Sequence, residues 1–566
     1  MPRLDAGSIF GRLLDRTRGG HCQIAPSAEH DVSRRYLDDT LVLETTFAAE
    51  GGRCRLIDCF TMRRGGREEP HRQVLRVVEG VRGRVELDVR VAPRFNYGEA
   101  LPWIRRLEGV VFTAIGGSEA LVVSGDVGLE SEGEHDLAGR ISVGEGERKR
   151  LSLVFAEPED VDPNPEGVPD VGDLERRLDE TVKWWRRWSE SGRATGPYAD
   201  AVRRSAMVLK GLTQARTGAI AAAATTSLPE VLGGGRNWDY RLSWVRDSTW
   251  AVRSLAELGH EAEADGFRRF VERSSAGHAE ELQVVYGLGG ERRLTETELD
   301  WLDGYRGSRP VRVGNEAATQ RQNDVYGELL EQAWRWQERG HAPDDEYWEF
   351  LVELVEGAAE RWRQPDRGMW ESRDDPEHFV HSKVMCWAAL DRGLRLARAS
   401  GRDVPRERWE RSRDEIRRAV EADGYDRDRG VFVRIFGDPQ VDGALLLLPQ
   451  VDFVDWSDER MVRTTDAIRE DLVRDGLVYR AAPEGGQEQE GAFLPCSFWL
   501  AECLVRQGRR DEAREVFERA CETVNDLGLF AEEWHPGTGQ MLGNFPQALT
   551  HLSHISAAQA LGSEYD

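Results

Sequence analysis

The alternation of apolar and polar residues changes its period along the chain, and each period predicts a different structure. Between residues 36 and 155 the period is two, most clearly where Val85, Leu87 and Val89 alternate with charged side chains. Short strands of this kind, separated by glycine-rich turns and with few helical stretches between them, are typical of a sandwich of two sheets. The sequence therefore predicts an N-terminal β-sandwich over residues 1–157.

A linker is expected next. Prolines stand among acidic residues here, so the segment can be neither a helix interior nor a central strand. An amphipathic helix is predicted from about residue 173 to residue 188. We place this linker with its helix at residues 158–197.

From residue 198 onwards the apolar period becomes helical. Val325, Leu329, Ala333 and Trp336, for example, fall on one stripe. Helices are expected to begin near residues 198, 244, 261, 322, 346, 379, 406, 441, 460, 491, 510 and 548. A dozen helices predict six helical hairpins that close into a toroid over residues 198–566.

The unusual sequence of this region lies in the segments that lead into every second predicted helix. These segments are residues 233–247, 322–324, 368–371, 441–443, 490–493 and 531–534. In a toroid of alternating outer and inner helices, the N-termini of the inner helices all lie at one end. We therefore expect the six segments to meet in one pocket, although they span about 300 residues of sequence.

Aromatic and ionisable side chains dominate these segments. Indole faces suit the C–H faces of a sugar ring, and guanidinium and carboxylate groups can hydrogen-bond its hydroxyls. A phosphate loop is not indicated, because no Gly-Lys-Ser/Thr follows Gly233–Gly235. The residues concerned are Trp238, Trp244, Trp370, Trp534, Arg246, Asp247, Asp324, Glu371 and Glu532. This composition favours a carbohydrate ligand.

Cleavage of a glycosidic bond needs two carboxyl groups, one protonated and one ionised. Glu371 follows the apolar Trp370, where desolvation would raise its pKa and keep it protonated. Glu532 is the natural partner from the far end of the chain. Taken alone, each is one of 102 Asp and Glu residues, most of which belong on the surface.

Charge and cysteine content narrow the function classes further. The net charge of −26 argues against nucleic acid or an anionic membrane as a partner. Seven cysteines without a CxxC pair predict neither a metal site nor a disulfide framework, and we expect no cofactor. No apolar run of membrane-spanning length and no signal segment are seen, so a cytoplasmic location is expected.

Several motifs together resemble glycoside hydrolase family 15, which contains glucoamylases, glucodextranases and certain bacterial trehalases. They are Thr225–Glu230, Arg236–Arg241, Trp244–Asp247, Gly304–Pro310, Leu445–Pro449, Glu490–Phe493 and Gly543–Ala548. The resemblance covers nearly the whole chain. It implies a multidomain β plus α protein in which an N-terminal β-sandwich is followed by a catalytic (α/α)6 barrel.

The resemblance also implies roles for individual residues in an inverting, exo-acting hydrolysis of α-glucosides that releases β-glucose. Glu371 becomes the general acid, and Glu532, the first Glu of its pair, becomes the general base. Arg246 and Asp247 would hold the terminal glucose, and Arg373 would help to fix Glu371. The full set of implied substrate-binding residues is Arg246, Asp247, Trp244, Asp324, Trp370 and Arg373.

Two departures from the family pattern stand out. A Pro-Arg-x-Asp segment that usually follows a further strand pair stands here at Pro2–Asp5, so we expect a sandwich truncated at its start or a chain start placed too late. In addition, His535 replaces an Asp that commonly follows the base motif.

Two other functions remain open. A glycoside phosphorylase would need a phosphate pocket in place of the base carboxylate, and an inert sugar-binding relative would be expected to lack one of the carboxyls. Both Glu371 and Glu532 are present, which favours hydrolysis. We expect a disaccharide or short oligosaccharide as substrate, with trehalose ahead of maltooligosaccharides, while isomaltose and dextran stay open.

Overall fold

The computed structural model describes residues 2–107, 109–161, 167–275, 277–482 and 490–563 of the 566-residue chain. The chain divides into two compact units. The first contains Met1–Arg193, Leu299–Val311 and Asp526–Gly528, and the second contains Ala194–Glu298, Arg312–Asn525 and Leu529–Asp566. Each unit is described by itself.

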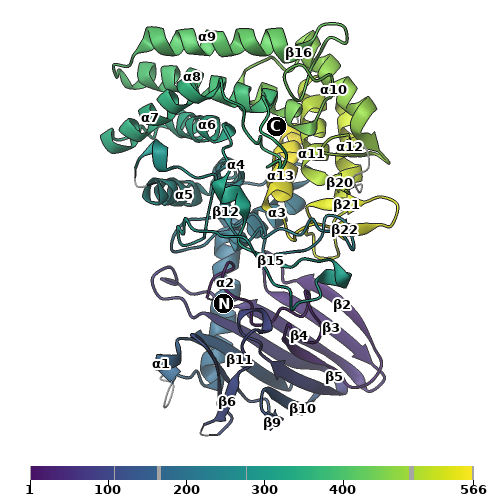
Figure 1. The fold of residues 1–566 in the computed structure, drawn as a ribbon. Helices are drawn as coiled ribbons and strands as arrows, with labels where there is room; N and C mark the ends of the chain where they lie inside the picture. Colours follow the sequence, from purple (N-terminus) through teal and green to yellow (C-terminus); the bar gives the residue numbers. More distant parts are fainter. Residues whose placement is uncertain (1, 108, 162–166, 276, 483–489, 564–566) are drawn as a thin grey trace. The chain divides into compact units, whose positions relative to one another are not determined.

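Antiparallel strands build the first unit (Figure 1). They are β1 (His21–Pro26), β2 (His30–Tyr36), β3 (Leu43–Ala49), β4 (Gly52–Phe60), β5 (Gln73–Ala92), β6 (Trp103–Arg106), β7 (Phe112–Gly116), β8 (Glu119–Gly125), β9 (Glu130–Glu132), β10 (Asp136–Gly144) and β11 (Arg148–Ala156). The long strand β5 belongs to two groups. Its first half pairs with β4 and β11 in the order β2-β3-β4-β5-β11-β8-β7-β6, and its second half pairs with β1 and β10.

One apolar core is shared by both groups of strands. Ile24 and Leu137 come from the group around the second half of β5, whereas Phe47 and Val123 come from the other group, and all four are buried in the same cluster. Every second side chain of β5 is buried, and because β5 belongs to both groups of strands, these side chains enter the core from both of them. The predicted β-sandwich is thus confirmed. The helices of this unit are α1 (Pro158–Val161) and α2 (Val171–Glu190), which begins at a capping box formed by Asp170 and Asp173.

The second unit is mainly helical (Figure 1). Its α-helices are α3 (Ala199–Leu212), α4 (Val245–Glu257), α5 (Glu261–Ser274), α6 (Asp324–Glu338), α7 (Asp345–Arg361), α8 (Val380–Ser400), α9 (Arg406–Asp423), α10 (Glu459–Leu472), α11 (Leu494–Arg506), α12 (Arg510–Cys521) and α13 (Ala548–Gly562). A helix begins close to each predicted start. Near residue 441 this helix is the 3₁₀-helix η5 (Gly443–Val451) and not an α-helix. Pro449 inside it cannot donate a backbone hydrogen bond, which disfavours a regular α-helix.

Burial separates the helices of this unit into inner and outer ones. Among the described residues, six inner elements contact one another in a closed ring: α4, α6, α8, η5, α11 and α13. Helix α8 is buried along most of its length, whereas the outer helix α9 buries only Trp409, Ile416 and Val420. The ring therefore brings the N-termini of the inner elements to one end of the barrel. No helix in the described ranges is long and apolar enough to cross a membrane.

Candidate active site

A cavity of about 710 Å³ opens in the second unit where the loops before the inner elements meet. Its walls include both predicted catalytic carboxyls, Glu371 and Glu532, although 161 positions separate them in the sequence. Other predicted site residues that line it are Trp244, Arg246, Asp247, Trp370 and Arg373. Asp324 is 1% exposed and is not part of the cavity wall.

Glu371 lies in the loop between α7 and α8. Asp366 and Glu377 close the base of this loop with two backbone hydrogen bonds of 2.9 and 2.8 Å. Glu371 itself has a φ of +58°, which places a non-glycine residue in the left-handed region. Burial raises the pKa of Glu371 to about 7, and the nearby Arg246 cation opposes that rise. The carboxyl therefore carries a proton at weakly acidic pH.

The indole of Trp370 is fixed beside this carboxyl. Its Nε1 donates a 2.8 Å hydrogen bond to Oδ2 of Asp442, a residue that is 3% exposed. The ring of Phe493 packs edge-on against it, with 5.4 Å between centroids, and the Arg480 guanidinium lies 5.8 Å from its centre. Trp370 is thus held from several sides and lines the same cavity as Glu371.

Arg246 joins the start of α4 to the loop that carries Glu371. Its Nη1 donates to the carbonyl of Met369 at 2.6 Å, and its Nη2 lies 3.0 Å from Asp247 and 3.5 Å from Oε1 of Glu371. Asp324, at the first turn of α6, acts on the same cation from a buried position. Burial raises the pKa of Asp324 to about 6, and the charge of Arg246 works against that rise.

Glu532 comes directly before the short strand β21 (Glu533–His535), which pairs with β20 (Ala492–Phe493) and β22 (Gln540–Leu542). It is 1% exposed. Its carbonyl accepts from Leu494 N at 3.1 Å, its N–H donates to Asn544 O at 3.3 Å, and its Oε2 accepts from Asn544 N at 3.4 Å. Backbone hydrogen bonds therefore fix both the chain and the carboxylate.

Gly543 makes room for Glu532. A Cβ at this position would lie 2.6 Å from Cβ of Glu532, and the φ of Gly543 is +72°. The glycine of the Gly-Asn-Phe-Pro motif is thus required twice, by its backbone conformation and by its closeness to the carboxyl side chain.

The neighbouring Glu533 is turned away from the cavity. Its Oε2 accepts a 2.9 Å hydrogen bond from Gly491 N, it is fully buried, and it does not line the cavity wall. Successive side chains of a strand point to opposite faces, so only one Glu of the pair can face the cavity. Glu532, and not Glu533, therefore faces the cavity.

Comparison with known proteins now identifies the family. Residues 196–559 match the model described as glycosyl hydrolases family 15, and residues 1–144 match the model described as trehalase-like, N-terminal. The chain belongs to glycosyl hydrolases family 15. The predicted class of reaction, hydrolysis of a glycosidic bond, is confirmed by this membership.

Proteins named trehalases match the chain over most of their length. The chain is 38% identical to a trehalase of Mycobacterium tuberculosis over 98% of this chain and 85% of that protein. It is 33% identical to a trehalase of Thermoplasma volcanium, with 99% and 89% covered, and 32% identical to trehalase 1 of Sulfolobus acidocaldarius, with 98% and 93% covered.

A solved structure supports the fold. The chain matches a bacterial glucoamylase complexed with acarbose with a TM-score of 0.72 and 11% identity, over 99% of this chain and 94% of that one. This match confirms the predicted fold class of a β-sandwich followed by an (α/α)6 barrel.

Three residues of this family 15 cavity escaped the sequence analysis: Tyr240, Arg480 and Glu230. Burial raises the pKa of Tyr240, and the charges of Glu532, Glu230 and Glu371 raise it further, while the Tyr240 hydroxyl in turn lowers the pKa of Glu532. Arg480 Nη2 lies 3.4 Å from Oε2 of Glu230. Tyr240 and Glu230 both stand within motifs already noted, so a signal existed for each of them, whereas Arg480 lies in none of these motifs. Arg480 and Glu230 are 250 residues apart, and no local pattern connects them.

The environment of Glu532 sets its proton affinity. Burial and the negative charge of Glu230 raise the pKa of Glu532, whereas Arg480, the Tyr240 hydroxyl and the Asn544 N–H favour its ionised form. The carboxyls of Glu230, Glu490 and Glu533 also approach within 4.8 Å of one another, a spacing that could hold a cation. Arg480 pairs with both Glu230 and Glu490, so positive charge is already supplied to this cluster by the chain.

Proposed function

We propose that this chain hydrolyses trehalose with inversion, using Glu371 as general acid and Glu532 as general base. The observation that carries the proposal is that these two carboxyls, from distant loops, line one cavity. The choice of substrate is supported by three relatives named trehalases that match almost the entire chain. Short maltooligosaccharides are the second candidate, because the fold is shared with a glucoamylase.

The reaction follows from the state of each carboxyl. Glu371, whose pKa is raised to about 7, donates its proton to the glycosidic oxygen as the C–O bond breaks and its electron pair passes to that oxygen. Glu532 takes a proton from a water molecule as that water attacks the anomeric carbon from the opposite face. One glucose leaves as the β-anomer, and the other keeps its α configuration.

Binding of the terminal glucose is assigned to Arg246 and Asp247, with Trp244 and Trp370 as apolar walls. All four line the cavity. Asp324 receives a different part in this proposal from the one expected from the sequence. It is buried outside the cavity wall, so it would hold the Arg246 cation in place rather than contact the sugar.

Asp247→Ala tests this assignment. We expect kcat/KM for trehalose to fall by about 100-fold or more, the equivalent of about 3 kcal/mol or more of lost transition-state stabilisation, at an unchanged fold. If the pair only stabilises the protein, the melting temperature falls and kcat/KM stays near the wild-type value. That outcome would remove Asp247 from the sugar site.

A substrate panel tests the function itself. Purified protein is incubated with trehalose, maltotriose, isomaltose and dextran, each with and without phosphate, and glucose and glucose 1-phosphate are quantified. Trehalose should give free glucose, and NMR of the fresh product should show β- and α-glucose in equal amounts. α-Glucose alone would indicate retention, and glucose 1-phosphate would indicate a phosphorylase. Activity on maltotriose without activity on trehalose would overturn the substrate assignment.

A further inference from the structure

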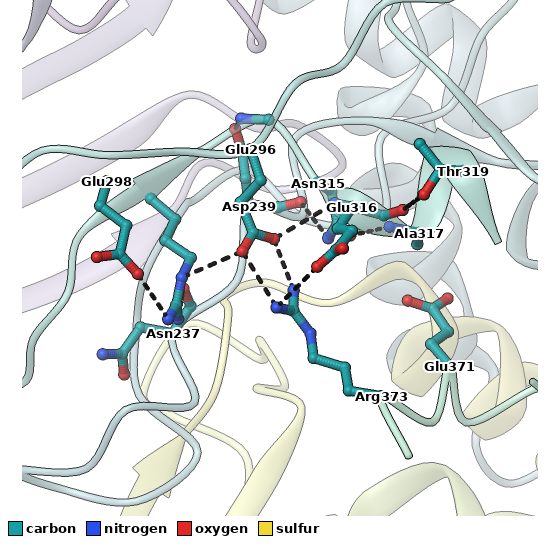
Figure 2. A network of polar contacts seen from close by, with 12 residues as sticks. Asn237, Asp239, Glu296, Glu298, Asn315, Glu316, Ala317, Thr319, Glu371 and Arg373 are labelled. Atoms are coloured by element: carbon teal, nitrogen blue, oxygen red, sulfur yellow. Dashed lines mark hydrogen bonds and ion pairs between the residues drawn. The ribbon is translucent and has the colours of Figure 1, made fainter. Parts of the chain in front are cut away.

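The segment that follows Glu371 is exposed from residue 373 to residue 377, yet one side chain in it is firmly held. The Arg373 guanidinium lies 2.6 and 3.2 Å from the two carboxylate oxygens of Glu296 and 3.3 Å from Glu316. It also lies 4.0 Å from the centre of the Trp238 ring. Figure 2 shows Arg373 pointing towards Glu296 and Glu316 and not towards the carboxyl of Glu371. Any effect of Arg373 on Glu371 therefore passes through the backbone.

Glu296 is the centre of this network. Its side chain is only 15% exposed, and its carboxylate contacts Arg373, the Nε of Arg312 at 3.3 Å and the N–H of Glu316 at 3.3 Å (Figure 2). A bidentate ion pair whose carboxylate is largely buried is screened less than a fully exposed pair and has a fixed geometry. Glu296 thus ties two loops together through one carboxylate.

The backbone around Glu296 is itself well ordered. Glu296 directly precedes strand β14 (Thr297–Glu298), which pairs with β15 (Arg312–Val313). Arg312 stacks 4.7 Å from the centre of the Trp238 ring and donates to Gly235 O at 2.8 Å. Arg312 and Arg373 therefore both lie against Trp238, and Glu296 bridges them. We call Glu296, Arg312, Arg373 and Trp238 the clamp.

The turn at Glu371 needs support of this kind. A non-glycine residue in the left-handed region costs about 1–3 kcal/mol and persists only where its surroundings hold it. Before Glu371 the chain is held by Arg246, which binds Met369 O. After Glu371 it is held by Gln320, whose Nε2 donates to Glu371 O at 3.2 Å, and then by Arg373 in the clamp.

We propose that Glu296 is a positioning residue for the general acid: it fixes Arg373 against Trp238 and so holds the Glu371 turn in its left-handed conformation. This inference rests on the proposed role of Glu371. Glu296 does not line the cavity, so it acts on the reaction through Arg373 and the backbone. Loss of the clamp lets the turn relax, and the proton of Glu371 is then misplaced relative to the glycosidic oxygen.

Glu296→Gln tests the inference, with Glu298→Gln as its matched control. Glu298 stands two residues away, is 60% exposed and pairs with Arg312 but not with Arg373. Two substrates are compared: trehalose, whose leaving group needs a proton, and α-glucosyl fluoride, whose leaving group does not. We expect Glu296→Gln to lower kcat/KM for trehalose by about 10- to 100-fold, since small displacements of a reacting group cost this much.

The same variant should keep kcat/KM for α-glucosyl fluoride within about threefold of wild type, because the rest of the site is intact. Glu298→Gln should leave both substrates unchanged. Equal losses on both substrates, or equal effects of the two variants, would overturn the inference, since a general loss of structure moves both together. Arg373→Lys keeps the charge but not the bidentate geometry, so it should reproduce the selective loss even if Glu296→Gln does not fold.

Failure of the inference and failure of the proposed function give different results. If wild-type protein does not hydrolyse trehalose, or if Glu371→Gln shows no selective loss on trehalose, the proposed function fails. If both of these behave as expected and Glu296→Gln matches its control, only the role of Glu296 fails.

Discussion

The two proposed catalytic carboxyls are held by different means. Glu371 lies at a left-handed turn of a loop, and side chains hold that loop: Arg246 binds it before the acid, and Gln320 and Arg373 hold it afterwards. Glu532 lies directly before the central strand of a small three-stranded sheet, where main-chain hydrogen bonds fix its backbone and one of its carboxylate oxygens.

The charged neighbours of the two carboxyls differ as well. The strongest charge on Glu371 is the cation of Arg246, whereas that on Glu532 is the anion of Glu230, opposed by Arg480. A loop held by side chains can be altered one contact at a time, but a strand held by its backbone tolerates little change of shape. Mutations around Glu371, which we call the acid side, should therefore lower activity in small steps. Steric changes around Glu532, the base side, should abolish most of the activity at once.

Loss of each carboxyl gives the largest effect and separates the two sides by substrate. Glu532→Gln should lower kcat/KM by about 10²–10⁴-fold on both trehalose and α-glucosyl fluoride, because water lacks its base in both reactions. Glu371→Gln should lose as much on trehalose but keep most activity on α-glucosyl fluoride. Steady-state kinetics with both substrates checks this. Equal losses in the two variants on α-glucosyl fluoride would contradict the assignment.

A single added methyl group tests the rigidity of the base side. Gly543→Ala places Cβ against Glu532 and should lower kcat/KM on both substrates by about 100-fold, since the base cannot stay in place. Gly539→Ala is the matched control, because Gly539 also has a positive φ, of +64°, but its nearest neighbour would be Trp534 Cζ2 at 3.8 Å. Both variants carry the left-handed strain, so a drop in kcat/KM shared by both would show that strain, and not the contact with Glu532, is responsible.

The sequence indicated the helix starts and the segments that carry Glu371 and Glu532. It did not indicate the side-chain contacts that hold the Glu371 loop. Helix starts could be predicted because apolar stripes are local, and Glu371 and Glu532 could be proposed because each stands in a segment that resembles a family motif. The 3₁₀ form of η5 could not be read from its leucine-rich run, because apolar periodicity does not distinguish a 3₁₀-helix from an α-helix and Pro449 had not been considered. Glu296 left no signal, since it pairs with a residue 77 positions away in a segment without periodicity.

The hydrogen bond between the Trp370 indole and Asp442 allows a milder test of the surroundings of Glu371. Asp442→Val removes the acceptor of its N–H, which is expected to cost about 1–3 kcal/mol of stability and to loosen the wall beside Glu371. We expect kcat/KM for trehalose to fall about 10-fold. Asp442→Asn retains an acceptor oxygen and should stay close to wild type. Equal activities of the Val and Asn variants would show that the hydrogen bond does not position Trp370.

The smallest expected effect is a shift in the pH profile, and it distinguishes the charges on the two sides. Glu532 must be ionised to act, so activity falls as pH drops through its pKa, and Glu230 raises that pKa by charge repulsion. Glu230→Gln should therefore lower the pKa of Glu532 and extend activity by about one unit towards lower pH. Glu371 must be protonated to act, so the alkaline limb belongs to Glu371, whose pKa is raised by burial, and activity is lost as pH rises through that pKa.

Because Glu230 does not rank among the main influences on Glu371, the alkaline limb should stay in place and serves as an internal control. The measurement is kcat/KM for trehalose from pH 4 to pH 9 in wild type and in Glu230→Gln. A parallel shift of both limbs would mean that Glu230 acts on the whole cavity and not on the base alone. An acidic limb that moves upwards would contradict the sign of the interaction and remove Glu532 as the group that titrates there.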